Sequence, residues 1–188
     1  MIIGRGVRSI FDEVLRARVA YVVSPWIQEP YASALLKMVM EGRARVVTSM
    51  DRENAFYKLL VKTHVISIAV MAIAGLAVAF SLFALLLTAL LIPSILIIAV
   101  PIFIAWLITG ITLLRLLEFK PPTNVKLSPP PKEYGFVHVK LYIADDRAWI
   151  GSANMTTSAW KRNIEVLVPI DVKTAVCIFK QIWKLIGN

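Results

Sequence analysis

The sequence has few of the residues on which a metal or disulfide protein depends. Only one of its 188 residues is a cysteine, Cys177, which excludes a disulfide framework and a zinc site built on cysteines. Its two histidines, His64 and His138, are too few for a multi-histidine metal centre, so we expect no metal and no other cofactor. Acidic residues are also scarce, and the net charge of +9 favours anionic partners such as phospholipid headgroups or nucleic acid.

Charged residues are missing altogether from the middle of the chain. The 52 residues between Lys62 and Arg115 include no Lys, Arg, Asp or Glu. This block is about twice as long as the ~20 apolar residues that one membrane crossing needs. Because Pro93 disfavours continued helix, we predict two spans, near 66–90 and 95–115, joined by a tight turn. The alternative is a buried helical hairpin of a soluble protein, but the remaining chain is too short to cover two fully apolar helices.

Basic residues flank both ends of the apolar block. Lys58 and Lys62 precede it, and Arg115 and Lys120 follow it. The positive-inside rule places both flanks in the cytoplasm, as an even number of spans also requires. The sequence therefore predicts an integral protein of the cell membrane with both termini cytoplasmic. Its predicted parts are an N-terminal α/β arm (1–62), a transmembrane helical hairpin (63–117) and a C-terminal arm (118–188).

The two soluble arms have the pattern of an α/β fold. Before the apolar block, strands over 18–23 and 44–48 alternate with helices over 29–42 and 51–62. This order predicts parallel strands. After the block, five prolines between positions 121 and 131 predict an extended linker. The predicted elements beyond the linker are strands over 136–144, 147–150 and 163–169 and an amphipathic helix over 171–186.

The residues that could carry chemistry lie in one string of the C-terminal arm. His138 and Lys140 are two apart on a predicted strand, so both side chains leave the same face. Asp145 follows at a predicted turn, and Gly151 to Asn154 (GSAN) come next. An imidazole can act as a nucleophile or as an acid and a base, while an ammonium group and the side chains of serine and asparagine can donate to an anion. A histidine in a half-buried strand and an aspartate in a turn also have ordinary structural roles.

The string HVKLYIADDRAWIGSAN resembles the HKD motif of the phospholipase D superfamily, usually His-x-Lys-x4-Asp followed by Gly-Ser-x-Asn. The segments SPWI at Ser24–Ile27 and Asn163-x-Glu165 are similar to those that flank this motif. Five residues separate Asp145 from Gly151 where many members have six, which predicts a hairpin one residue tighter. The resemblance implies a phospholipase D-like mixed sheet flanked by helices, interrupted here by the two-helix transmembrane hairpin.

The resemblance also implies roles for individual residues. His138 is expected to form a phosphohistidine, and Glu165 to hold its other ring nitrogen. Gly151 is expected to let the backbone approach the phosphate closely. The implied catalytic residues are His138, Lys140, Asp145 and Glu165. The implied phosphate-binding residues are Lys140, Gly151, Ser152 and Asn154. The scheme requires no metal.

The superfamily uses two histidines from two motifs, whereas this chain has one motif. Either two copies form a homodimer that shares one active site, or the protein is inactive. We predict a membrane-anchored phosphodiesterase that hydrolyses phospholipid. One alternative is an endonuclease on the same scaffold, which the net charge favours. The absence of an aromatic-and-basic run favours lipid over nucleic acid. The third possibility is a non-catalytic membrane scaffold.

Overall fold

The computed structural model describes residues 1–91, 104, 108 and 119–186. The described chain divides into two compact units. The first unit combines Met1–Leu60 with Pro121–Asn188, so it is built from both soluble arms. The second unit is Val61–Lys120 and holds the apolar block.

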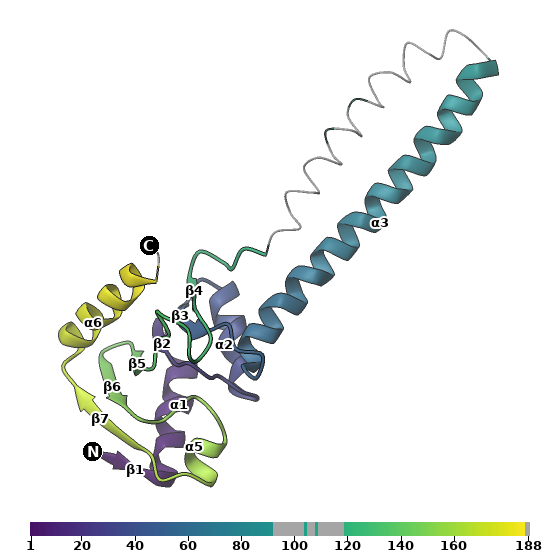
Figure 1. Cartoon of the computed structure of the whole chain (residues 1–188). Coiled ribbons are helices and arrows are strands. Elements are labelled where there is room, and N and C mark those ends of the chain that lie inside the picture. Colours follow the sequence, from purple (N-terminus) through teal and green to yellow (C-terminus); the bar gives the residue numbers. More distant parts are fainter. Residues whose placement is uncertain (92–103, 105–107, 109–118, 187–188) are drawn as a thin grey trace. The chain divides into compact units, whose positions relative to one another are not determined.

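The first unit contains one seven-stranded mixed sheet in the order β1-β7-β6-β5-β2-β3-β4. Its strands are β1 (Ile2–Ile3), β2 (Ala20–Val23), β3 (Ala44–Ser49), β4 (Val125–Ser128), β5 (Lys140–Ala144), β6 (Arg147–Gly151) and β7 (Val166–Ile170). The β2–β3 and β3–β4 pairs are parallel and the other pairs are antiparallel. The predicted α/β fold is therefore confirmed, although the hairpin predicted to interrupt it is not. Figure 1 shows β1 beside β7 at one edge of the sheet.

Helices cover both faces of this sheet. They are the 3-10 turn η1 (Gly4–Gly6), α1 (Val7–Arg16), α2 (Tyr31–Met40), the start of α3 (Ala55–Leu91), α5 (Ser158–Lys161) and α6 (Val172–Leu185). Helix α6 packs on the face that carries Leu141 and Ile143 of β5. Phe11 of α1 packs on Tyr142, whose side chain points to the opposite face because side chains alternate along a strand. Strand β5 is thus buried on both sides, as its five buried residues show.

Several elements differ from the sequence predictions: β1, η1 and α5 were not predicted, and β7 begins at Val166 instead of residue 163. Helix α1 was not predicted, although Val7, Ile10 and Val14 give it a buried stripe at helical spacing. Part of the predicted proline linker is strand β4, which pairs with β3 at the edge of the sheet. This is possible because the prolines flank β4 without entering it, so each of its residues keeps a backbone donor.

The strand predicted to begin at residue 136 begins instead at Lys140. Its neighbours explain the late start. Strand β2 pairs with β5 only as far as Leu141, opposite Val23, and Lys140 pairs with Gly151, the last residue of β6. Residues 136–139 therefore extend beyond the ends of both adjacent strands and have no ladder partner.

The apolar block forms the greater part of α3. The described part of this helix over Ala55–Ser81 is long and apolar enough to cross a membrane, and none of its most apolar stretch is buried. A core helix of a soluble protein is mostly buried, so this exposure favours a membrane segment. The predicted first span, 66–90, lies within α3. The predicted turn at Pro93 and nearly all of the second span over 95–115 lie outside the described residues.

Candidate active site

His138 and Lys140 meet where β5 begins. The Lys140 Nζ lies 2.9 Å from the His138 Nε2 and also donates to the backbone oxygen of His138 at 2.9 Å. An ammonium group has only donors, so Nε2 accepts this bond and the ring proton belongs on Nδ1. The imidazole is exposed, whereas Lys140 is only 4% exposed. The unliganded site therefore holds a neutral imidazole whose Nε2 is covered by a cation.

The surroundings of His138 and Lys140 lower the pKa of both side chains and so favour their neutral forms. Desolvation of the ring by neighbouring side chains, followed by the charge of Lys140, lowers the pKa of His138 below its ordinary value. Burial also lowers the pKa of Lys140, while the nearby carboxylate of Glu165 opposes that shift. A depressed histidine pKa keeps the ring neutral over a wider pH range, as a nucleophile requires.

Gly151 permits a close approach between β6 and the start of β7. A Cβ at Gly151 would lie 1.9 Å from the backbone oxygen of Val166, so only glycine fits there. Two hydrogen bonds fasten this approach: Ser152 N donates to Val166 O at 3.0 Å, and Val166 N donates to the Ser152 Oγ at 3.1 Å. The space beside the Gly151 Cα is filled by protein backbone. The structure thus gives Gly151 a packing role that brings Glu165 next to Ser152, and its role beside a phosphate stays a prediction.

Glu165 does not hold His138 in this structure. Among the described residues its carboxylate accepts from the Ser152 Oγ and from the Asn163 Nδ2, the latter at 3.1 Å. The predicted Glu165–His138 bond is therefore replaced by a Ser152–Glu165–Asn163 group. Its negative charge only partly offsets the burial that lowers the pKa of Lys140.

Asn154 carries a polar atom that is left without a partner. Its side-chain Oδ1 is buried and accepts no hydrogen bond within the described part of the chain. Its backbone oxygen accepts from Thr156 N at 2.8 Å, which fixes the turn. Buried polar atoms almost always have a partner, so this oxygen is positioned to accept from a donor that lies outside the described residues.

Asp145 lies at the opposite end of β5 from His138 and Lys140. Five residues of extended strand separate the two ends by about 16 Å. Its carboxylate accepts from the backbone amides of Arg18 and Val19 at 3.2 and 3.0 Å, and these bonds lower its pKa. The turn is as tight as predicted, because Ala144 pairs directly with Arg147. In this geometry the Asp145 carboxylate contacts backbone amides and lies away from His138, and its catalytic role stays a prediction.

Residues 113–185 match the family model described as the PLD-like domain of cardiolipin synthase. This match confirms the resemblance to the phospholipase D superfamily. No curated protein matches the chain. Two solved structures are similar to it: NucT from Helicobacter pylori, with 16% identity, TM-score 0.48 and coverage of 96% of this chain and 87% of that one; and the phospholipase D family member Nuc from Salmonella typhimurium, with 13% identity, TM-score 0.47 and coverage of 97% and 91%.

The PLD-like match contains every predicted site residue but omits the N-terminal arm, which also reaches the site. The Trp26 ring lies 6.4 Å from the His138 ring, and Phe136 lies 5.8 Å from both. The Trp26 Nε1 donates to Asp51 at 3.0 Å, and Ile27 pairs with Met155 just after the GSAN turn. Sequence reasoning missed Trp26, although the SPWI segment that contains it was the available signal. No cluster of three potential metal ligands occurs among the described residues.

Proposed function

We propose that the protein is a phosphodiesterase in which the His138 Nε2 attacks phosphorus. The observation that supports this most is the 2.9 Å contact between this nitrogen and the Lys140 ammonium, within the segment that matches a PLD-like domain. An ammonium bound to a ring nitrogen can instead bind phosphoryl oxygens when a phosphodiester enters. The same movement exposes the nucleophile.

The chemistry runs in two steps. In the first, a bond forms between His138 Nε2 and phosphorus, the bond to the leaving oxygen breaks, and that oxygen takes a proton from an acid. In the second, water attacks phosphorus and gives its proton to the group that acted as the acid in the first step, while the P–N bond breaks and the neutral imidazole returns. Lys140 neutralises charge on the phosphoryl oxygens, and the side-chain amide nitrogen of Asn154 donates a further hydrogen bond to them. Glu165 helps to keep Lys140 protonated.

The acid for the leaving oxygen comes from a second copy of the chain. The other histidine of the sequence, His64, lies on α3 in the apolar unit, so the first unit alone contains one imidazole. A two-fold dimer brings two copies of His138 to one phosphate. Mixing a His138→Ala chain with a Lys140→Ala chain should then leave activity far below wild type. Full activity in strictly monomeric protein would contradict the shared site.

The proposed substrate is phospholipid, and the proposed location is the cell membrane. The exposed, apolar α3 supports an anchor that holds the site within reach of headgroups. With the second span predicted over 95–115, both soluble arms and both termini are cytoplasmic.

Nucleic acid is the second candidate substrate, because the chain carries a net charge of +9. A basic and aromatic cluster adds to this argument. The Arg8 guanidinium lies 4.9 Å and the Lys161 Nζ 5.1 Å from the Trp160 ring. The cluster is held in place by the bond from Trp160 Nε1 to the Tyr31 hydroxyl at 2.7 Å.

The deciding experiment compares detergent-solubilised protein with its His138→Ala variant on labelled phospholipids and on single- and double-stranded DNA. Release of a headgroup that the variant loses supports the phospholipid proposal. Nicking that the variant loses supports the endonuclease instead. No turnover of either substrate, together with no trapped phosphoryl-enzyme, would leave the non-catalytic scaffold.

A further inference from the structure

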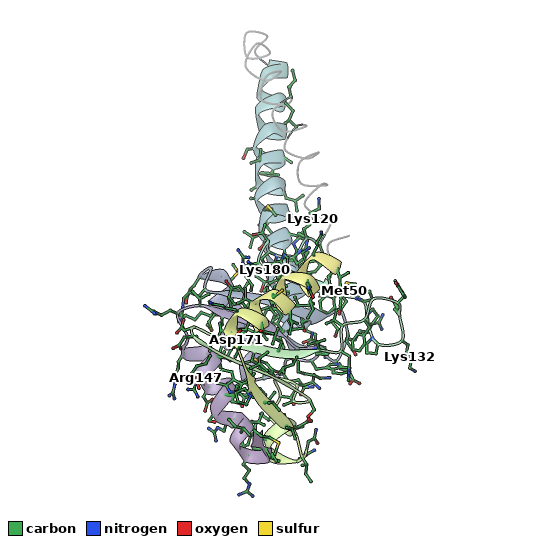
Figure 2. All side chains as sticks on the ribbon, turned by 90° about the vertical axis from the view of Figure 1, so that its left-hand side faces the viewer. Met50, Lys120, Lys132, Arg147, Asp171 and Lys180 are labelled. Carbon is green, nitrogen blue, oxygen red and sulfur yellow. The ribbon has the colours of Figure 1, made fainter. Side chains whose placement is uncertain are left out.

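Helix α6 presents a stripe of cations to solvent. Lys173, Cys177, Lys180 and Lys184 are spaced four, three and four residues apart, so they lie on one helix face, and all four are exposed. Helix α6 contains no acidic residue. The nearest acid in sequence, Asp171, caps the helix by accepting from Thr174 N at 2.9 Å. Figure 2 labels Asp171 and Lys180 along this helix.

A fourth lysine and a tryptophan extend the stripe at the C-terminal end of α6. The Lys126 Nζ of β4 lies 5.5 Å from the ring of Trp183, which is only half-buried. The neighbouring Leu185 is 77% exposed. Lysines on one face, with an indole and an exposed aliphatic side chain beside them, are typical of helices that lie at a membrane surface. We call Lys126, Lys173, Lys180 and Lys184 the lysine surface.

A short stretch of chain connects the lysine surface to the second unit. Only six residues lead from Lys120, the last residue of the second unit, to Lys126. Even fully extended, they span no more than about 22 Å. A lysine surface on so short a tether to a membrane-crossing segment is held at high effective concentration beside the leaflet.

We propose that the lysine surface docks on the anionic headgroups of that leaflet. This inference rests on the proposed membrane anchor and concerns a surface that the catalytic proposal does not use. Charge complementarity favours anionic lipid over a second copy of the chain, since a two-fold contact through this face would bring like charges together.

The single cysteine of the chain provides the test, because Cys177 lies exposed within the stripe. The full chain carries an environment-sensitive fluorophore on Cys177 and is inserted into nanodiscs of phosphatidylcholine, alone or mixed with phosphatidylglycerol. We expect blue-shifted emission and protection from an aqueous quencher only in the anionic discs, with reversal at high salt. The triple variant Lys173→Gln, Lys180→Gln, Lys184→Gln should reduce the ratio of docked to undocked chain on the order of 100-fold.

A matched variant separates local docking from net charge. Arg8→Gln, Lys161→Gln and Arg162→Gln remove the same charge around Trp160 and should leave the fluorophore response intact. An equal loss in both triple variants would overturn the proposal. Two other results would also overturn it. The first is protection of the fluorophore in neutral discs that hold two chains but not in neutral discs that hold one, which indicates contact with a second copy. The second is protection of the fluorophore by an added oligonucleotide. A His138→Ala chain should keep the full response, so a failure of the catalytic proposal is distinguishable from a failure of docking.

Discussion

The two ends of strand β5 carry polar side chains in opposite situations. At its start, Lys140 is buried and donates to a ring nitrogen and a backbone oxygen of His138. At its end, Asp145 is exposed and both carboxylate oxygens accept from backbone amides, while its own amide donates to Val19 O at 3.0 Å. The motif thus contains the Lys140 ammonium, whose bonds to His138 a ligand can replace, and the Asp145 carboxylate, both of whose oxygens already accept backbone hydrogen bonds.

This difference indicates that Lys140 and Asp145 have different roles within the HKD string. The bonds of Asp145 tie the β5–β6 turn to the chain just before β2, next to the pairing of Ala20 with Ala144. They fix how the N-terminal arm joins the motif. The Lys140–His138 bond fixes no register, and a phosphate can take the place of the imidazole. We therefore expect substitutions at the two ends to change different measured quantities.

The largest expected effect separates the two ends by activity. Lys140→Met keeps the length and apolar stem of a buried side chain, so the fold should survive while turnover falls on the order of 10³-fold. Asp145→Asn should keep wild-type turnover per folded molecule. The measurement is the initial rate on whichever substrate the wild-type protein cleaves, with circular dichroism to verify folding. An equal loss of rate in both variants would remove the distinction between the ends.

The second expected effect concerns the close approach of β7 to β6 at Gly151, beside the start of β5. Gly151→Ala would place a methyl group 1.9 Å from Val166 O, so β7 must move. We expect the free energy of unfolding to fall by about 2–4 kcal/mol, measured by urea denaturation. Gly42→Ala is the control: Gly42 has φ +73° but open space around it, and its cost should be about 1–2 kcal/mol. A Gly151→Ala protein as stable as wild type would show that β7 yields freely.

Much of this fold follows from local sequence patterns. Strand β2 and helix α2 were predicted to within two residues, because a short apolar run and a helical stripe between turn residues are local signals. Strand β4 was missed because its pairing with β3 joins positions about 80 residues apart, which no local pattern records. The late start of β5 has the same cause, since it depends on where β2 and β6 end.

The sequence identified the residues of the candidate site but not all of the contacts that they make. The spacing of His138 and Lys140 places them together, and the structure brings them into contact. The partner of Glu165 depends on the approach of β7 to β6 at Gly151, which selects Ser152 over His138. The contacts of Asp145 were not predictable, because a motif position specifies a residue type and not its neighbours, which here are two backbone amides of the N-terminal arm.

A smaller expected effect is the pH dependence of the stability that Asp145 provides at the end of β5. The pKa of Asp145 is lowered by its backbone hydrogen bonds, so its stabilising contribution is present above its unfolded value of 3.8 and is lost as the pH falls through the lower folded value. Asp145→Asn should therefore lower the thermal midpoint at neutral pH, and the gap to wild type should narrow below about pH 4. Scans of both proteins at several pH values give the measurement. A gap that stays constant into acid would show that the carboxylate charge contributes nothing.

The smallest expected effect concerns the ionisation of the active end. The pKa of His138 is lowered first by burial and second by the Lys140 charge, so removing that charge should recover only part of the shift. NMR titration of histidine-labelled protein should give a His138 pKa below 6.5 that rises in Lys140→Met without passing 6.5, while His64→Gln assigns the two signals. Lys180→Met removes a lysine from α6 and should leave the titration unchanged. An unchanged His138 pKa in Lys140→Met would mean that the ammonium does not face the ring in solution. It would contradict the proposal that the Lys140 ammonium covers the His138 Nε2.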